Sequence, residues 1–122
     1  MSRRGRRQEA EQQGRRAEKF AAFYLRLKGY RILATRVRRA PIEVDLLARR
    51  GDTLVIVEVK YRRTLDQAEL ALAPSALRRL ARMAELVAAD AAWRRRVATN
   101  VRVDLIALAP WAWPRHIRGV TP

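Results

Sequence analysis

The 122-residue sequence contains no cysteine and only one histidine. The absence of cysteine excludes disulfide bonds and thiolate metal sites, and a single histidine excludes a two-histidine metal site. No apolar run approaches the roughly 20 residues that cross a membrane. The charged start MSRRGRRQEAEQQGRR has no apolar stretch, so we expect no secretory signal. Together these absences favour a cytoplasmic protein with a single domain.

Acidic residues are also scarce. The chain has 12 Asp and Glu against 27 Lys and Arg, which gives a net charge of +15 and a pI near 11.7. Such a charge favours binding to polyanions, above all nucleic acid. Lysine and arginine side chains displace the cations condensed on the phosphates, and the release of these cations favours binding. An acidic protein partner, or codon bias toward arginine and alanine, is the alternative. A membrane surface is disfavoured, since no helix combines a basic face with large apolar anchors.

Hydrophobic periodicity indicates one mixed α/β domain. Residues 1–8 hold four arginines and no acid, and we expect them to form a disordered basic arm ahead of a single domain over 9–122. The predicted helices cover 9–28 and Pro74 to about Trp93, with a loop over 62–73; the predicted strands cover 30–38, 42–48, 53–60 and 101–109, with a short edge strand in the tail. The order α-β-β-β-α-β predicts a sheet with helices packed on it.

Two charged residues interrupt the most apolar strand, TLVIVEVK at 53–60. If the turn Gly51-Asp52 closes a hairpin with the preceding strand, Asp45 lies opposite Glu58 and Glu43 lies opposite Lys60. All four side chains then share one face of the sheet. Like charges on directly opposed residues destabilise a sheet, so the Asp45–Glu58 pair calls for a positive charge between its members.

A divalent cation is one candidate for that charge. Oxygen ligands without histidine or cysteine suit Mg²⁺ or Mn²⁺, which bind phosphate and activate water. Lys60 is one of only three lysines, and its compact ammonium suits orienting a nucleophile or holding a phosphate. The alternative is a salt-bridge cluster in which Lys60 pairs with Glu43.

The remaining candidates have weaker signals. Glu18 lies on a small apolar patch of the first helix, where it either adds a ligand or reaches an arginine. Asp104 is explained by an ion pair with Arg102 in the same strand, and His116 by packing of the tail. Trp111 and Trp113 are able to stack on bases, but covering the edge of the sheet is the favoured interpretation.

Five segments carry a family resemblance: GRRAEKFAAFYLRLKGYRILATRVR, IEVDLLARRGDTLVIVEVKYRR, ALRRLARMAEL, VRVDLIAL and RHI. In this order they resemble the uncharacterised bacterial YraN-like family over about residues 9–118. That family is similar to archaeal Holliday-junction resolvases and to restriction-endonuclease-like PD-(D/E)xK nucleases. The central stretch resembles the family's GEIDLIA…VFVEVK, the D…ExK core of nucleases that cut phosphodiesters with Mg²⁺.

The resemblance implies a role for each matching residue. Asp45 looks like the metal-bridging aspartate, Glu58 like the second metal carboxylate and Lys60 like the catalytic lysine. The backbone carbonyl of Val59 completes the implied metal coordination.

Outside the D…ExK core, Glu18 matches the acid of a GE pair in the family's first helix, and Glu43 matches an accessory glutamate. Four positions depart from the family pattern. Ala17 and Ile42 each replace a glycine, Arg36 replaces an asparagine and Ala76 replaces a lysine.

The resemblance therefore implies a restriction-endonuclease-like α/β fold and a Mg²⁺- or Mn²⁺-dependent endonuclease that acts on branched or structured DNA. The alternative is a non-catalytic nucleic-acid-binding or scaffold protein with the same fold, and an RNA-associated factor is a third reading. A homodimer and a protein partner needed for activity are further expectations. Eight arginines are expected to contact phosphates: Arg36, Arg38, Arg39, Arg62, Arg63, Arg78, Arg79 and Arg82.

Overall fold

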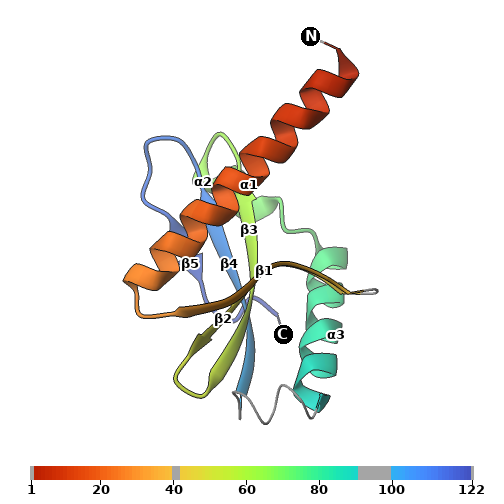
Figure 1. Ribbon diagram of the computed structural model, residues 1–122, viewed down its shortest axis with the longest axis vertical. Coiled ribbons are helices and arrows are strands. Elements are labelled where there is room, and N and C mark those ends of the chain that lie inside the picture. The colour runs from red at the N-terminus through yellow and green to blue at the C-terminus, as the bar shows by residue number, and fades with distance from the viewer. Residues whose placement is uncertain (1, 40–41, 91–99, 122) are drawn as a thin grey trace.

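The computed structural model describes residues 2–39, 42–90 and 100–121. It is a mixed α/β fold in which helices flank a five-stranded sheet of order β1-β2-β3-β4-β5 (Figure 1). The elements are α1 (Arg3–Leu27), β1 (Arg31–Arg39), β2 (Ile42–Arg50), β3 (Thr53–Tyr61), α2 (Leu65–Leu70), α3 (Pro74–Ala89), β4 (Asn100–Leu108) and β5 (Arg115–Ile117). No helix in these ranges is long and apolar enough to cross a membrane.

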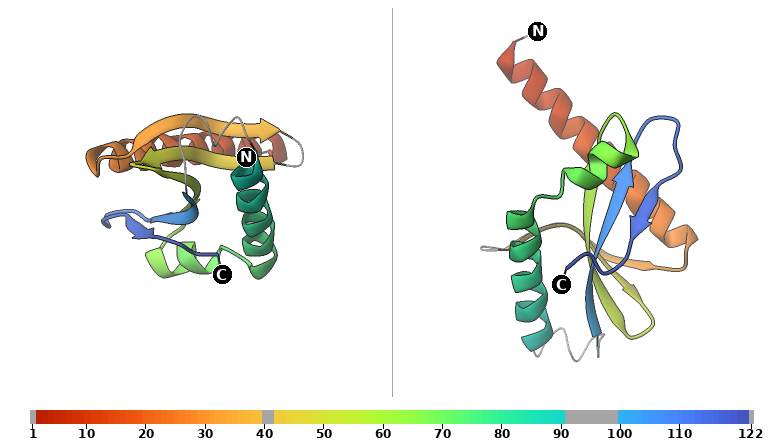
Figure 2. Two further views of the ribbon diagram at one scale, coloured as in Figure 1. Left: turned by 90° about the horizontal axis from the view of Figure 1, so that it is seen from below. Right: turned by 180° about the vertical axis from the view of Figure 1, so that it is seen from behind.

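The first helix is longer than the sequence pattern suggested. The Ser2 hydroxyl accepts a hydrogen bond from the Gly5 N–H at 3.0 Å and caps α1, so residues 3–8 are helical and the prediction of a disordered arm is wrong. Arginine and glutamine are good helix formers, which supports helix even where nothing packs on it. The first turns of α1 extend beyond the sheet, as Figures 1 and 2 show.

The other predicted elements agree with the structure to within a few residues, with one addition. The expected loop over 62–73 contains the short helix α2, which the Thr64 hydroxyl caps by accepting from the Gln67 N–H at 3.1 Å. The described part of α3 ends at Ala89, so the predicted end near Trp93 lies outside the described residues.

The sheet pairs β1, β2 and β3 antiparallel, β3 with β4 parallel, and β4 with β5 antiparallel. The two parallel strands lie at the centre, and residues 54–57 of β3 are completely buried. Continuous burial on both faces explains why this strand reads as an unbroken apolar run. The chain passes from β3 to β4 by way of α2 and α3.

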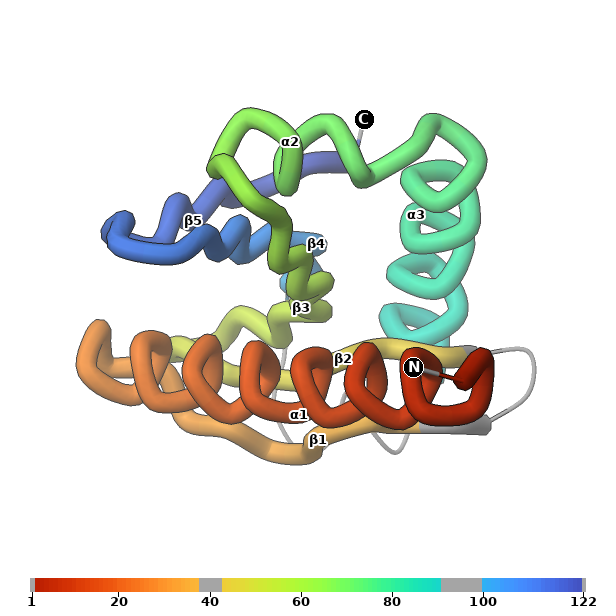
Figure 3. The backbone as a smooth tube through the Cα atoms, turned by 90° about the horizontal axis from the view of Figure 1, so that it is seen from above, coloured from red at the N-terminus to blue at the C-terminus, as the bar shows by residue number. Residues whose placement is uncertain are grey.

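The helices bury the two faces of the sheet separately. On one face Ala17, Ala21 and Leu25 of α1 pack on the sheet, and on the other face Leu80 and Met83 of α3 do so. Figure 3 shows α1 alongside β1 and β2, with α2 and α3 on the opposite side of the sheet. The small alanines let α1 approach the strands closely, so polar groups on its inner face lie near the sheet.

Asp104 on β4 is the most deeply buried charged residue in the described ranges, with no exposed surface. Its carboxylate accepts from Arg102 Nε at 2.7 Å, from His116 Nε2 at 2.8 Å and from the Gly119 N–H at 3.1 Å. Lys28 Nζ lies 2.6 Å from the other ring nitrogen of His116. The predicted Asp104–Arg102 ion pair is confirmed, and His116 joins β5 to it.

This network sets the protonation of Asp104. Burial acts to raise the pKa of the Asp104 carboxyl, but the hydrogen bonds from His116, Arg102 and Gly119 outweigh burial and lower the pKa to about 2. The carboxylate therefore stays charged in the folded protein at any ordinary pH.

Replacing Asp104 by asparagine is expected to lower the free energy of unfolding by about 3 kcal/mol at pH 7, because Arg102 and His116 lose a buried anionic partner. Since the native pKa lies below the ordinary 3.8, the wild-type advantage is complete above pH 4 and is lost as the pH falls through 2. Urea unfolding of both proteins across this pH range measures the difference. Asp66→Asn is the control, because this exposed carboxylate pairs with Arg115 at the surface. Equal losses in the two variants would contradict the assignment.

Candidate active site

The strands β2 and β3 separate at Asp45. Their ladder runs from Arg50 opposite Thr53 to Leu46 opposite Val57, in the register that the hairpin turn predicted, and ends there. Beyond it, Asp45 Oδ2 accepts a hydrogen bond from the Val59 N–H at 2.8 Å. The Asp45 side chain thus makes a hydrogen bond to the β3 backbone at a point where the β2 backbone is no longer paired with it.

The separation changes which way β2 faces. Leu46 packs on the α1 side of the sheet, whereas Val44 and Leu47 pack on the α3 side. Residues two apart in a regular strand share a face, so the alternation is broken between Val44 and Leu46. Asp45 lies at this break, and its side chain is turned toward β3. The predicted direct pairing of Asp45 with Glu58 is therefore wrong, although the two carboxylates remain neighbours.

The adjacent strand is irregular at the same level. On β1, Thr35 pairs with Leu46 and Val37 pairs with Val44, which leaves Arg36 across from Asp45. Arg36 has a φ of 51°, in the left-handed region that residues with a Cβ rarely adopt. The distortion at the site therefore extends over two strands.

Glu58 and Lys60 lie on β3, on the face that α3 covers. Glu58 is 8% exposed, and its Oε1 is 3.6 Å from Lys60 Nζ. Lys60 is partly exposed at the end of the buried part of the strand. The ammonium thus lies between a buried carboxylate and the solvent, where an incoming anion would meet it first.

Both carboxylates of the site are harder to ionise than usual. Burial and, to a smaller extent, the charge of Asp45 raise the pKa of Glu58 to about 7, although Lys60 and Arg79 act to lower it. Burial likewise raises the pKa of Asp45, against the Val59 hydrogen bond that lowers it, and the charge of Glu18 adds to the rise. Two buried, mutually repelling carboxylates are stabilised by a bound cation.

Glu18 comes to the same region from α1 but has its own partner. Its carboxylate accepts from Arg36 Nε at 2.7 Å, and both side chains are partly buried. Of the two roles open to Glu18 from the sequence, reaching an arginine is the one observed. Nothing in the sequence marked Arg36 as its partner, because the pairing depends on how α1 crosses β1.

Glu43 does not join the site. It lies in the part of β2 that pairs only with β1, opposite Arg38, and its side chain is exposed. The ladder between β2 and β3 ends before it, so the predicted position across from Lys60 is wrong.

Few side chains are therefore available to hold a metal. Among the described residues, no three or more His, Cys, Asp or Glu side chains form a group placed to bind one ion. Asp45 and Glu58 remain as the acid pair, with Val59 contributing its N–H to Asp45. Two carboxylates still suit Mg²⁺, which keeps several waters and completes its shell with substrate phosphate.

The predicted phosphate-binding arginines fall into three groups. Arg36 is engaged by Glu18, and the side chains of Arg38 and Arg39 lie outside the described residues. The other five are exposed: Arg62, Arg63, Arg78, Arg79 and Arg82. Arg79 on α3 is near enough to Glu58 to lower its pKa. Exposed positive charge therefore flanks the acid pair.

A small cavity of about 160 Å³ opens between α1 and the end of β3. Glu18 and Lys60 both line it, together with Gln13, Tyr61 and Arg62. The cavity gives solvent access to the side of the site where α1 crosses the sheet.

Replacing Glu58 by glutamine is expected to stabilise the fold at high pH. The folded-state pKa near 7 exceeds the ordinary 4.5, so the wild-type protein loses stability as the pH rises from 4.5 through 7. At pH 8 Glu58→Gln should raise the free energy of unfolding by about 2 kcal/mol, with no gain at pH 4.5. Urea unfolding in the presence of a chelator measures both values. The exposed Glu85→Gln on α3 is the control, and an equal effect at both pH values would refute the electrostatic explanation.

The family model and the similar proteins that match this chain all name the same family. The chain matches the model of "Uncharacterised protein family UPF0102" over residues 17–108. A UPF0102 protein of Chelativorans sp. is 46% identical over 118 residues, covering 93% of this chain and 90% of the relative. One from Sphingopyxis alaskensis is 46% identical over 108 residues, 88% of this chain and 90% of the relative. One from Brucella canis is 44% identical over 104 residues, 85% of this chain and 81% of the relative. In agreement with the YraN-like resemblance, the chain belongs to the UPF0102 family.

Proposed function

We propose that this protein is a metal-dependent nucleic-acid phosphodiester hydrolase, an endonuclease-like enzyme that acts on branched or structured DNA. The observation that carries the proposal is the pair of buried carboxylates with raised pKa values, Asp45 and Glu58, beside the partly exposed ammonium of Lys60. Stability alone does not favour such a pair, and sites of this kind are common where chemistry takes place.

The strand arrangement supports the same conclusion. One carboxylate comes from β2, and the other carboxylate and the lysine come from the antiparallel neighbour β3. This order resembles the D…ExK core of restriction-endonuclease-like nucleases, and a mixed sheet between helices agrees with that fold. The likeness is one of arrangement and sequence pattern, and the chemistry rests on the residues themselves.

Asp45 and Glu58 are the residues that would hold a Mg²⁺ or Mn²⁺ ion. Such an ion supplies Lewis-acid chemistry, polarising a phosphoryl oxygen and favouring hydroxide over water near neutral pH. The Val59 N–H fixes one oxygen of Asp45 in place, which leaves the other oxygen free to be a ligand. The donors are all oxygens, as these hard cations require.

Lys60 is the residue that would act on the substrate. Its ammonium is held near Glu58 at the solvent side of the pair. There it would contact a non-bridging phosphate oxygen, offset the charge that develops there, and orient the attacking water. Glu18 is neutralised by Arg36, so its contribution is electrostatic, through the pKa of Asp45.

Metal binding and cleavage test the proposal together. In low salt, titration calorimetry should detect Mn²⁺ binding to the wild-type protein and none to Asp45→Asn, because that variant loses an anionic ligand. Cleavage of a labelled DNA junction should fall on the order of 100-fold or more in Asp45→Asn and in Lys60→Ala, while DNA binding persists. Glu85→Gln, which changes an exposed carboxylate on α3, should leave both properties unchanged.

The rival outcome is equally specific. Among the residues that the structure describes, no third acidic ligand joins Asp45 and Glu58. This observation favours a non-catalytic nucleic-acid-binding protein on a nuclease-like fold. In that case the wild-type protein would bind the junction but would bind no metal, even with DNA present. Neither a chelator nor the substitution Asp45→Asn would change the affinity for the junction. That combination of results would end the nuclease proposal.

The exposed arginines should bind phosphates. Replacing Arg63 and Arg79 together by alanine is expected to lower the slope of log affinity against log salt by about two, roughly one for each phosphate contact. Filter binding or anisotropy over a salt series measures the slope. Arg115→Ala is the control, since Asp66 and Glu69 already neutralise that side chain at 2.8 Å. An unchanged slope in the double variant would remove these arginines from the interface.

A further inference from the structure

The two tryptophans between β4 and β5 are exposed. Trp111 is fully exposed and Trp113 is 86% exposed, so the prediction that they cover the edge of the sheet is wrong. Trp111 also has a φ of 59°, a backbone conformation that residues with a Cβ rarely adopt. Neighbouring large aromatic side chains that are exposed to solvent often mark a binding surface. Residues with strained backbone conformations are also frequent at binding sites.

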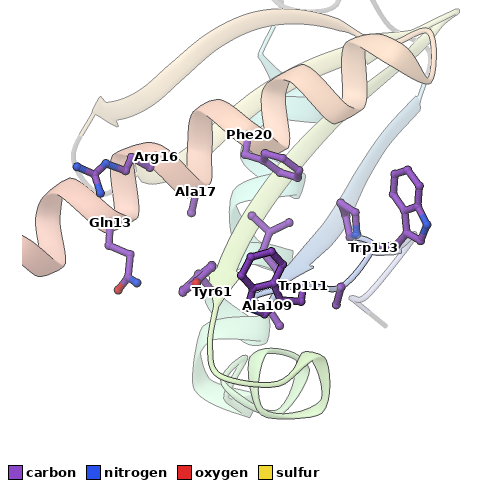
Figure 4. Close-up of a pocket in the computed structure, with 11 residues that line it drawn as sticks. Gln13, Arg16, Ala17, Phe20, Tyr61, Ala109, Trp111 and Trp113 are labelled. Carbon is purple, nitrogen blue, oxygen red and sulfur yellow. The ribbon is translucent and has the colours of Figure 1, made fainter.

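These tryptophans line a cavity of about 650 Å³ between α1 and the connection after β4. Figure 4 shows Phe20 projecting from α1 toward the connection that carries Trp111 and Trp113, and Tyr61 of β3 also lines the cavity. The volume lies within the range of small-ligand sites. Aromatic side chains from three separate parts of the chain therefore surround one opening.

The aromatic cavity continues into the candidate active site. It shares Gln13, Ala17 and Tyr61 with the small cavity that Glu18 and Lys60 line. Tyr61 directly follows Lys60 on β3. A ligand in the aromatic cavity would therefore extend toward the end of β3, where Lys60 lines the small cavity.

The charge around the opening favours a polyanion. Among the described residues that line the aromatic cavity, Arg16 is charged and none carries a carboxylate. Arg62 and Glu18 both line the small cavity, and Glu18 is paired with Arg36. The combination of aromatic faces for stacking with flanking arginines for phosphate is typical of single-strand binding sites.

We propose that this aromatic cavity binds an unpaired nucleobase of the strand whose phosphate lies at Lys60. A paired base is stacked on both faces within a duplex and is not available to the aromatic side chains. The preferred ligands of this protein are therefore nucleic acids with unpaired nucleotides, such as a duplex with a single-stranded tail. This inference rests on the proposed function for the position of the phosphate, and it narrows the substrate class of that site.

The test measures binding without cleavage. Fluorescence anisotropy with a chelator present compares a blunt DNA duplex with the same duplex carrying a single-stranded tail. The wild-type protein should prefer the tailed duplex, and Trp111→Ala should weaken tail binding by roughly 10-fold while leaving blunt-duplex binding unchanged. Trp111→Tyr should restore most of the affinity. Phe23→Ala is the control, because Phe23 is an exposed aromatic residue on α1 that is not among the residues lining the cavity.

A tail that lacks bases provides the matching change in the ligand. Abasic tail nucleotides should weaken wild-type binding as much as Trp111→Ala does, and the two changes together should add little. The inference is overturned if the abasic tail binds like the intact one, or if Trp111→Ala lowers binding of both duplexes equally. It is also overturned if sedimentation shows that Trp111→Ala dissociates a dimer, because the cavity then binds a second copy of the chain.

The outcome for catalysis is separate. If the tail preference depends on Trp111 but no metal supports cleavage, the proposed hydrolase activity fails and the base-binding cavity stands. If cleavage depends on Asp45 but Trp111→Ala has no effect on tail binding, the hydrolase stands and the base-binding cavity fails.

Discussion

The hydrogen bond from the Val59 N–H to the carboxylate of Asp45 is the interaction on which the candidate site depends. It forms where the ladder between β2 and β3 ends, so it lets the strands separate without leaving this N–H unbonded. The separation gives Asp45 a place between the two faces of the sheet. Glu18 from α1 and Glu58 from the α3 face can then both act on one carboxylate.

Two buried acids with opposite behaviour show how the fold treats carboxylates. Asp104 is surrounded by donors from Arg102, His116 and Gly119, and its pKa falls to about 2. Glu58 has one ammonium 3.6 Å away and a neighbouring carboxylate, and its pKa rises to about 7. The first arrangement stabilises the fold as an ion pair should. The second lowers stability at neutral pH, which is the usual sign of a group kept for binding or chemistry.

Positive charge is used in two distinct ways. Arg36 and Arg102 are partly buried and each satisfies a specific carboxylate, Glu18 and Asp104 respectively. Arg62, Arg63, Arg78, Arg79 and Arg82 are instead exposed, and Arg79 is near enough to Glu58 to lower its pKa. Arg36 holds its position despite a left-handed backbone, which the ion pair with Glu18 helps to maintain.

The sequence by itself determined the order of the elements, the register at the β2–β3 turn and the meeting of Asp45, Glu58 and Lys60, because apolar periodicity and turn length are local properties. It also predicted the Asp104–Arg102 pair, since both residues lie on one strand. Only the tertiary structure decided that β2 leaves β3 at Asp45, that Arg36 binds Glu18, and that Glu43 is exposed opposite Arg38. It likewise left Trp111 and Trp113 exposed above a cavity. These features depend on how α1 and the β4–β5 connection cross the sheet, and such long-range packing has no period or spacing in the sequence.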